Sequence, residues 1–502
     1  MAEPYYITTA ISYPNGKPHI GHAYEAIAAD AMARFRRAQG RDVRLVTGTD
    51  EHGLKMVQTA RAEGRDTLEY ADEMSGYFRK MCDDLNISYD AFVRTTEPRH
   101  YEASAAIWKA MEEAGDLYLD RYEGWYSVRD EAFYDESELI DGEGSEKLSP
   151  QRTPVEWTAE ETWFFRLSKY QDRLLALYRD NPDFIRPETR RNEVARFVEG
   201  GLKDLSVSRT SFDWGVPVPG SPGHVMYVWV DALTTYMTGV GFPQRKGDYA
   251  RYWPADVHLI GKDIVRFHAV YWPAFLMSAN LPLPKQIFGH GFLLARGEKM
   301  SKSLGNVVDP MELAADFGVD QLRYFLLREI SFGQDGSYSR EAIVNRVNSE
   351  LANSFGNLAQ RSLSMVFKNL DGVIPAIGEA EEDRALLGQV RQACLALAVE
   401  FDRFAFSAGL EAWMSAVFAC NAYIDAAAPW ALKKTDPERM AAVLGTLVVA
   451  VRELALALQP VIPASAEKLI ALIDSGKDGN PIAQPTPIFP RLELGEEEEA
   501  AA

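Results

Sequence analysis

The stretch YPNGKPHIGHAYE, residues 13–25, decides the fold of the first part of the chain. Before it, residues 5–11 form a short apolar and β-branched run that ends in turn residues, a pattern typical of a buried strand. After it, residues 22–38 space their apolar side chains as a helix does and are closed by Gly40. Residues 43–47 then repeat the strand pattern. Strand, helix and strand in this order predict a β-α-β unit, the building block of a parallel, doubly wound α/β sheet.

Outward from this unit, the chain predicts an insertion, further strands and a helical bundle. From residue 116 the sequence turns aromatic, acidic and alternating, which indicates a small α+β insertion of short antiparallel strands, with a helical stretch near 168–178. Beyond residue 339 apolar side chains recur at helical spacing and predict a C-terminal α-helical bundle. Buried-strand patterns resume between these parts as VMYVWVD (225–231), VHLIGKD (257–263) and QIFGHGF (286–292). The helical stripe comprises Val344, Val347, Leu351, Phe355 and Leu358.

Length and composition restrict the class of protein. At 502 residues the chain is long enough for two or more domains. Its net charge of -20 argues against a protein that coats nucleic acid by bulk electrostatics, so any nucleic-acid partner needs local basic and aromatic positions. Its three cysteines form no CxxC pair, and we find neither a secretory signal nor a membrane span. We therefore expect a cytoplasmic protein.

His19 and His22 lie where the predicted helix begins. A helix N-terminus presents unpaired N–H groups and the positive end of a dipole, so phosphate is its natural ligand. Both imidazoles are placed to donate to phosphate oxygens, and Gly21 allows a close approach of ligand and backbone. The alternative is that two histidines stand at a helix end by chance.

A second charged stretch, GEKMSKSLGN at 297–306, is a glycine-flanked loop with two lysines. Lys299 and Lys302 make a pair of cations suited to closing on a polyphosphate. Alone, such a loop is usually a solvated surface. The five-residue string KMSKS, however, has a chance probability on the order of 10⁻⁴ in a chain of this length.

Together, HIGH at 19–22 and KMSKS at 299–303 resemble the paired signatures of class I aminoacyl-tRNA synthetases, in the same order around a split nucleotide-binding sheet. The wider context resembles the methionyl-tRNA synthetase family over nearly the whole chain. That context is AISYPNGKPHIGH, TGTDEHG, YVWVDALTTY, IGKDIVRFH and GHGFLLARGEKMSKS. The resemblance implies activation of L-methionine by ATP with Mg²⁺, and transfer of methionine to tRNA(Met).

The resemblance also implies which residues hold methionine. Asp50 matches the carboxylate that meets the amino group, and the remaining positions match the thioether pocket. Tyr13 and His268 would each donate a weak hydrogen bond to the sulfur, while aromatic walls grip it. For Trp229 and Tyr236 the alternative is an ordinary aromatic core. The pocket positions are Ile11, Tyr13, Trp229, Ala232, Leu233, Tyr236, Ile264 and His268.

For ATP, the resemblance places Gly261 and Asp263 at the ribose, in a crevice beyond a strand end. Gly289, His290 and Gly291 would leave room for adenosine. Asp263 is alternatively a helix N-cap, and both roles are compatible. The full ATP set is Asn15, Gly21, Gly261, Asp263, Gly289, His290, Gly291 and Lys302, and the catalytic set is His19, His22, Lys299 and Lys302.

In the predicted bundle, Asn353, Asn357 and Arg361 fall at i, i+4 and i+8 and therefore on one helix face. Amides and guanidinium groups read unpaired base edges, and Trp430, after Pro429, offers a stacking plane. Polar residues along a helix are usually only its solvated side. The resemblance favours the other interpretation, since NxxxNLxxR and PW match the family's positions for reading a CAU anticodon.

One departure from the family concerns zinc. Many members carry zinc knuckles built from CxxC pairs in the insertion, and the corresponding stretch here has no cysteine. We therefore expect no structural zinc and no other bound metal site. The sequence also ends soon after the bundle, without the appended tRNA-binding domain of some relatives, which favours a monomer.

The expected domain limits follow from these assignments. They are 1–115 for the first half of the catalytic domain, 116–222 for the connective insertion, 223–290 for the second catalytic half, 291–338 for the KMSKS loop and stem-contact region, 339–490 for the anticodon-binding bundle and 491–502 for an acidic tail expected to be disordered.

Three other functions are compatible with parts of the sequence. Another class I synthetase is one, although the leucyl, isoleucyl and valyl enzymes need a larger insertion and a cysteinyl enzyme needs a thiolate-bound zinc. A small-molecule nucleotidyltransferase with the same HxGH turn is the second, but it leaves the bundle and Trp430 unexplained. A non-catalytic tRNA-binding scaffold is the third, and the intact HIGH and KMSKS motifs argue against it.

Overall fold

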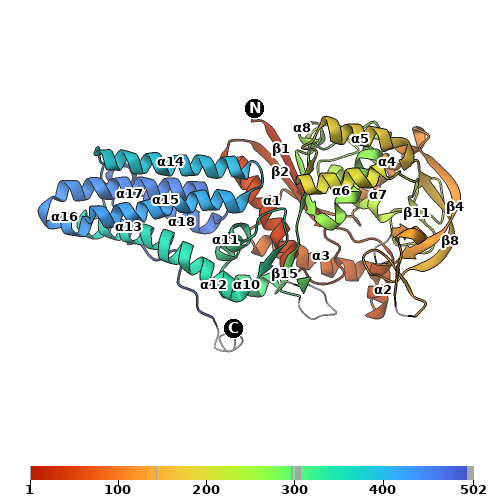
Figure 1. Cartoon of the computed structure of the whole chain (residues 1–502), viewed down its shortest axis with the longest axis horizontal. Coiled ribbons are helices and arrows are strands. Elements are labelled where there is room, and N and C mark those ends of the chain that lie inside the picture. The colour runs from red at the N-terminus through yellow and green to blue at the C-terminus, as the bar shows by residue number, and fades with distance from the viewer. Residues whose placement is uncertain (1, 130–131, 143, 296–297, 300–306, 495–502) are drawn as a thin grey trace. The chain divides into compact units, whose positions relative to one another are not determined.

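The computed structural model describes residues 2–129, 132–142, 144–295, 298–299 and 307–494 (Figure 1). The chain divides into two compact units, each assembled from separate segments. Unit 1 comprises Met1–Pro18, Gln39–Asp83 and Ile87–His290. Unit 2 comprises His19–Ala38, Asp84–Asn86 and Gly291–Ala502, so the helix that follows the first strand belongs to a different unit from the strand itself.

Within its described residues, unit 1 contains a six-stranded sheet of order β3-β2-β1-β13-β14-β9. Every neighbouring pair runs parallel. Chain order proceeds outward from β1 through β2 to β3 and from β13 to β14, while β9, which precedes β13 in the chain, is added at the far edge. The switch point of a doubly wound sheet therefore lies between β1 and β13. This confirms the predicted fold class. The strands are β1 (Pro4–Thr9), β2 (Asp42–Thr49), β3 (Ala91–Arg94), β9 (Ile185–Arg186), β13 (Val257–Gly261) and β14 (Ile287–His290).

The central strands are buried on both faces, as parallel sheets require. Tyr5 to Thr9 of β1 are all buried, and Ile7 pairs with Leu45 on one side and Val257 on the other. The predicted strands at 5–11, 43–47, 257–263 and 286–292 therefore exist, with ends shifted by a few residues.

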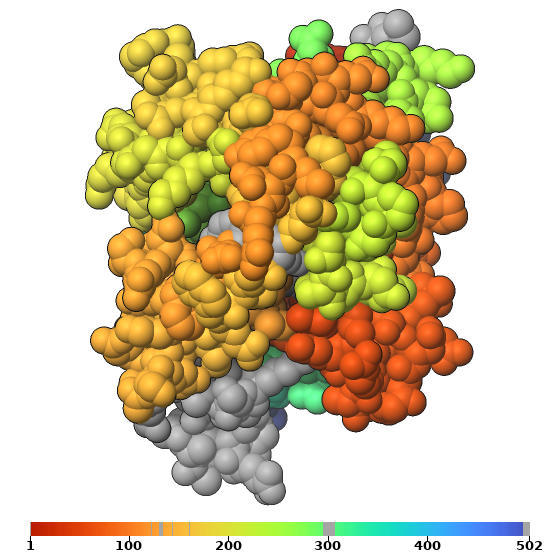
Figure 2. All heavy atoms as spheres, turned by 90° about the vertical axis from the view of Figure 1, so that its right-hand side faces the viewer, coloured from red at the N-terminus to blue at the C-terminus, as the bar shows by residue number. Residues whose placement is uncertain are grey.

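The segment expected to be an insertion forms the predicted antiparallel sheet, of order β10-β8-β4-β5. In Figure 2 the orange segments that include β4 and β8 form part of one face. The same segment also supplies β9, which extends the main sheet beside β14. The other strands and short helix of this segment are β4 (Leu117–Ser127), β5 (Ala132–Tyr134), η1 (Glu136–Glu138), β6 (Ile140–Asp141), β7 (Lys147–Leu148), β8 (Glu156–Phe165), β10 (Leu205–Ser206) and β11 (Ser208–Arg209). Strand β12 (Val225–Met226), which pairs with β11, follows directly after the segment.

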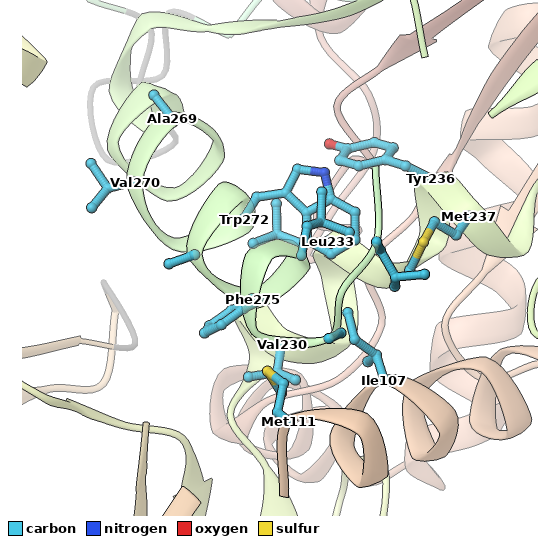
Figure 3. Packing of buried hydrophobic residues seen from close by; sticks show 14 of the residues in the cluster. Ile107, Met111, Val230, Leu233, Tyr236, Met237, Ala269, Val270, Trp272 and Phe275 are labelled. Carbon is cyan, nitrogen blue, oxygen red and sulfur yellow. The ribbon is translucent and has the colours of Figure 1, made fainter. Parts of the chain in front are cut away.

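One predicted strand is wrong. The run at 225–231 holds only the two-residue strand β12, and helix α7 begins at Val228. Every residue of α7 except Trp229 is buried, so the helix has no solvated polar face, and a short buried run does not distinguish a helix from a strand. Figure 3 shows the reason for this burial: α7 packs over Ile107 and Met111 of α4, beside Trp272 and Phe275 of α9.

The other helices of unit 1 flank these strands and confirm the helical stretch expected near 168–178. They are α2 (Leu54–Ala62), α3 (Thr67–Asp84), α4 (Pro98–Glu113), η2 (Leu167–Tyr170), α5 (Gln171–Asp180), α6 (Glu188–Glu199), α7 (Val228–Thr238), α8 (Asp248–Tyr252), η3 (Lys262–Ile264), η4 (Phe267–Tyr271) and α9 (Trp272–Ser278).

Unit 2 begins with α1 (Ile20–Ala38), the helix predicted after the opening motif, and continues from residue 291 with a small sheet of order β16-β15-β17. Its elements after α1 are β15 (Leu293–Ala295), β16 (Glu298–Lys299), α10 (Pro310–Phe317), α11 (Val319–Glu329), β17 (Gly336–Tyr338), α12 (Arg340–Arg346), η6 (Val347–Gly356), α13 (Asn357–Asn369), α14 (Glu381–Phe401), α15 (Phe406–Ala427), α16 (Pro429–Thr435), α17 (Pro437–Leu458), α18 (Pro463–Asp474) and η7 (Lys477–Gly479).

The C-terminal helices form the predicted bundle, in which α14, α15 and α17 run side by side (Figure 1). All five residues of the predicted stripe are buried. Their path includes a π-helical segment, η6, that the sequence did not predict. Helix α17 is long and apolar enough to cross a membrane, but it is mostly buried, as the core helix of a bundle is. The expected disorder of the tail concerns residues that mostly lie outside the described ones.

Candidate functional site

Four neighbouring strands of unit 1 bring predicted ligand-binding residues to one edge of the sheet. Tyr13 follows β1, Asp50 follows β2, Asp263 follows β13 and His290 ends β14. Because these strands are parallel, their carboxyl ends share one edge, where doubly wound sheets bind ligands. The Asp50 N–H donates to the Ser12 carbonyl at 2.9 Å, which holds the proposed ammonium-binding residue beside the segment of Ile11 and Tyr13.

The predicted thioether positions also gather within unit 1. Ala232, Leu233 and Tyr236 come from α7, and His268 comes from η4. All four side chains are buried, and the Tyr236 hydroxyl lies 2.6 Å from His268 Nε2.

Trp229, the half-buried residue of α7, stacks on Phe267 with ring centroids 3.9 Å apart and meets the His268 ring edge to face. Ile264, in η3, is half-buried beside them, and its carbonyl oxygen accepts a hydrogen bond from His268. The structure therefore brings the aromatic positions together as one wall. Because this wall also borders the hydrophobic core, it agrees with the alternative of an ordinary aromatic core as well.

The hydrogen bonds of His268 revise its expected role. Its Nδ1 lies 2.9 Å from the Ile264 carbonyl oxygen, which only accepts, so the ring proton is on Nδ1. Burial lowers the pKa of His268 to about 4, so the ring is neutral and Nε2 must accept from the Tyr236 hydroxyl. His268 in this state has no N–H left for a thioether, and the expected donation from it is wrong for this arrangement. Its contribution is to fix the direction of the Tyr236 hydroxyl.

The three glycines expected at the nucleotide are explained differently by their surroundings. A Cβ on Gly261 would lie 2.8 Å from the Asp263 carboxylate, so this glycine admits that carboxylate to the strand end. A Cβ on Gly289 would meet Val265 at 2.5 Å, and one on Gly291 would meet the Gln334 carbonyl oxygen at 2.1 Å. Packing therefore requires the last two glycines, whatever room they leave for adenosine. Asp263 lies inside η3 and makes no capping hydrogen bond, so the N-cap alternative is wrong.

The two motif histidines stack on each other in unit 2, with ring centroids 3.8 Å apart. Each Nδ1 accepts a backbone N–H at 3.1 Å, that of His19 for the His22 ring and that of Gly21 for the His19 ring. The proton of each neutral ring is therefore on Nε2. Burial and the neighbouring His19 lower the pKa of His22 well below its usual value, so the His22 ring in the first turn of α1 is neutral and keeps one N–H, on Nε2.

The segment that follows the KMSKS string returns to this turn. The Ile20 N–H, between the two histidines, donates to the Val308 carbonyl at 3.0 Å. Helix α1 also contacts β15, which pairs with β16 and so places the Lys299 backbone opposite Leu294. Lys302 lies outside the described residues. The described segments before and after the lysine loop therefore both contact α1.

A second candidate site lies on the bundle. The Arg361 guanidinium lies 5.4 Å from the ring centre of Trp430 and forms an ion pair with Asp425 at 2.8 Å. Trp430 is 49% exposed, which is unusual for so large a ring. Pro429 is buried and begins α16, directly before Trp430.

Asn353 and Asn357 are exposed, but Asn353 lies in the π-helical η6 and Asn357 begins α13. Because a π-helix has more residues per turn, these two amides are offset from the single face that α-helical spacing predicts.

A polar network near Asp50 was missed by the sequence reasoning. Glu51 is fully buried and accepts from Arg94 Nε at 2.6 Å and Nη2 at 2.8 Å. His52 is also buried and is bonded to Asp231 of α7. The signal was available in TGTDEHG and YVWVDAL, where charged residues interrupt apolar runs, because buried charges need partners.

Metal ligands do not converge in the part of the chain that the structure describes: no group of three or more His, Cys, Asp or Glu is arranged to hold an ion.

Comparison with known proteins agrees with the geometry. Residues 5–363 match the family model of class I (M) tRNA synthetases, and residues 374–498 match the anticodon-binding domain of methionyl tRNA ligase. The chain is 58% identical to the methionine-tRNA ligase of Rhizobium meliloti, over 97% of this chain and 98% of that one. It is 56% identical to that of Mycobacterium bovis, over 98% of each. The structure of Mycobacterium tuberculosis methionyl-tRNA synthetase with methionyl-adenylate matches with a TM-score of 0.94 at 55% identity, covering 97% of this chain and 100% of that one.

Proposed function

The chain belongs to the class I (M) tRNA synthetases, and on this premise we propose that it joins L-methionine to tRNA(Met) at the expense of ATP. In the first step the methionine carboxylate attacks the α-phosphorus of ATP, supplied as its Mg²⁺ complex. The bond to the bridging oxygen breaks and pyrophosphate leaves. In the second step a hydroxyl of the 3′ terminal adenosine of the tRNA attacks the acyl carbon, and AMP leaves. Neither step needs a protein nucleophile, so catalysis comes from positioning and charge stabilisation.

The observation that carries the proposal is that the chain directly after the lysine segment contacts the histidine turn within unit 2. The Ile20 N–H donates to the carbonyl of Val308, two residues after that segment ends. This supports a role for His19, His22, Lys299 and Lys302 as donors to one triphosphate. The neutral His22 ring supplies a hydrogen bond without a second buried charge.

The methionine and nucleotide assignments rest on the sheet edge of unit 1. We assign the ammonium to Asp50 and the thioether to the wall formed by Trp229, Tyr236 and their neighbours, which agrees with a weakly polar, polarizable side chain. Gly261 and Asp263 are assigned to the ribose because the carboxylate lies directly over the strand end. Asn15 and His290, half-buried and buried at the same edge, complete the ATP assignments.

The anticodon assignment rests on the exposed Trp430 and its contact with Arg361. Such a ring and guanidinium pair stacks and reads unpaired bases. We include the exposed Asn353 and Asn357 in the same assignment, together with the buried Pro429, which begins α16 directly before Trp430. We also retain the expected domain limits, the cytoplasmic location and the monomeric state as proposals, the last of which sedimentation velocity tests.

The reaction is tested by methionine-dependent exchange of labelled pyrophosphate into ATP. We expect Lys302→Ala to lower the exchange kcat by about 10²- to 10³-fold, the range found when one preorganised donor to a developing charge is removed. Lys477→Ala is the control, since Lys477 makes an exposed ion pair with Asp474 and should leave exchange unchanged. Exchange without methionine dependence would contradict the function, and exchange that survives Lys302→Ala would contradict only the role of that lysine.

A further inference from the structure

Asp231 is a fully buried carboxylate that lies on α7 between two residues of the proposed methionine wall, Trp229 and Ala232. Each of its oxygens receives one imidazole: His52 Nδ1 lies 2.5 Å from Oδ2, and His100 Nε2 lies 2.5 Å from Oδ1. Burial alone would raise the pKa of Asp231, but the charge and hydrogen bonds of the two imidazoles outweigh it and lower the pKa to about 2. The carboxylate is therefore ionised at neutral pH, and both imidazoles donate to it.

The two histidines come from different supports. His100 lies in the first turn of α4, where its Nδ1 is 2.9 Å from the Thr238 hydroxyl. That helix packs under α7 through Ile107 and Met111 and carries no residue assigned to a substrate (Figure 3). His52 instead follows Asp50 by two residues, in the loop after β2.

The loop that carries Asp50 is held from two sides. Glu51 is fixed by two hydrogen bonds from Arg94, and its carbonyl accepts from Trp214 Nε1 at 2.6 Å. His52 adds the bond to Asp231, while its Nε2 lies 3.1 Å from the Tyr101 hydroxyl. Of these contacts, the bond from His52 is the one that joins the loop to α7.

We propose that His52 is a positioning residue for methionine. Through its bond to Asp231, His52 holds the Asp50 loop in a fixed position relative to the wall on α7. The proposal rests on the proposed function, because it assigns the ammonium to Asp50 and the side chain to α7. Misplacing two groups that bind opposite ends of one small substrate weakens its binding, whereas ATP binding is spared because its assigned residues lie outside the Asp50 loop and α7.

The two imidazoles allow a matched test. His52→Leu and His100→Leu each remove one donor from the same buried carboxylate, so both should destabilise the protein to a similar extent. In pyrophosphate exchange we expect His52→Leu to raise the KM for methionine about tenfold or more, with the KM for ATP changed less than twofold. We expect His100→Leu to raise the KM for methionine less than threefold. His52→Asn should restore most of the loss, because its amide nitrogen replaces Nδ1.

Equal rises of the methionine KM in the two leucine variants would overturn the proposal, and so would a parallel rise for ATP or a failure of His52→Asn to rescue. If His52→Leu does not fold, His52→Gln compared with His100→Asn gives the same contrast, since each keeps a donor but displaces it. Wild-type protein without methionine-dependent exchange would contradict the proposed function itself, which separates the two failures.

Discussion

Each unit contains a fully buried aspartate on a helix, and the two carboxylates have different kinds of partner. Asp231 in unit 1 is held by two imidazoles. Asp30 in unit 2 accepts from two guanidinium groups, Arg34 Nε at 2.7 Å and Arg323 Nη2 at 2.6 Å. Arginine is charged at every usable pH, whereas an imidazole changes its charge near neutrality.

The arginine bond in unit 2 joins segments far apart in the chain. Arg323 is fully buried and also donates to the carbonyls of Val461 at 2.9 Å, Pro460 at 3.1 Å and Leu85 at 3.2 Å. It thereby connects helix α1, which begins at the motif histidines, to the turn that precedes α18. The imidazole bonds of unit 1 instead join a loop, through His52, and helix α4, through His100, to helix α7. Permanent charge therefore stabilises the assembly of distant segments in unit 2, whereas imidazole donors position neighbouring elements in unit 1.

The largest effect should come from breaking the arginine network. Arg323→Met removes one of the two cations from the buried Asp30 and leaves several carbonyls without a donor. We expect a loss of about 3–5 kcal/mol in the free energy of unfolding, the usual result of removing one partner of a buried pair. Urea unfolding measures it. Arg36→Gln is the control on α1, the helix that carries Asp30, because its partner Asp402 is 48% exposed and such a pair contributes about 0–1 kcal/mol. Equal losses in both variants would contradict the assembly role.

A pH titration sharpens the comparison, because buried imidazoles should make unit 1 sensitive to acid. The pKa of His268 is about 4 when folded and about 6.5 when unfolded, so between these values the unfolded chain binds the extra proton. The contribution of His268 to the free energy of unfolding is therefore fully present above about pH 6.5. It is lost as the pH drops towards about 4, by about 3 kcal/mol in total.

The matched variant for this titration is His268→Gln, which keeps an acceptor near the Tyr236 hydroxyl and does not titrate. It should flatten the decline by about 1.4 kcal/mol per pH unit. Unfolding free energies measured at pH 5 and pH 7 decide the matter, and an unchanged slope would show that His268 is not the group that titrates.

The smallest expected changes in the free energy of unfolding come from replacing a glycine with alanine, at one position in each unit. Gly289→Ala in β14 forces a Cβ against Val265 and should cost about 1–3 kcal/mol, as overpacking does. Gly388→Ala in α14 meets nothing within 4 Å and should stabilise the helix by about 0.5–1 kcal/mol. Thermal unfolding should therefore shift in opposite directions. A gain at Gly289 would show that the strand end has room to spare, as the adenosine interpretation requires.

Local patterns were enough to predict much of the fold. Period and turn residues located β1, α1 and β2, because strand and helix repeats differ and glycine and proline mark their ends. The bundle stripe from Val344 to Leu358 was predicted for the same reason. The run at 225–231 was not, since a helix buried on all sides loses the polar face that distinguishes it.

The candidate site divides in the same way. His19, His22 and the KMSKS lysines were identifiable from the sequence, because donor side chains at a helix start and paired lysines in a loop are the groups that bind phosphate. The bond between Ile20 and Val308, about 290 positions apart, was not. Neither was the tautomer of His268, which depends on a carbonyl and a hydroxyl that only the folded chain brings to its two nitrogens.

By itself, then, the sequence determined which elements form, in what order, and which residue types stand at the strand ends and at the start of α1. These properties are local, since they depend on neighbours within a few positions. Only the tertiary structure decided that Asp231 would face two imidazoles and Asp30 two arginines. It also decided that neighbouring atoms would occupy the space that a Cβ would need at Gly289 and Gly291. Such partners come from distant segments, and sequence spacing carries no record of which buried group meets which.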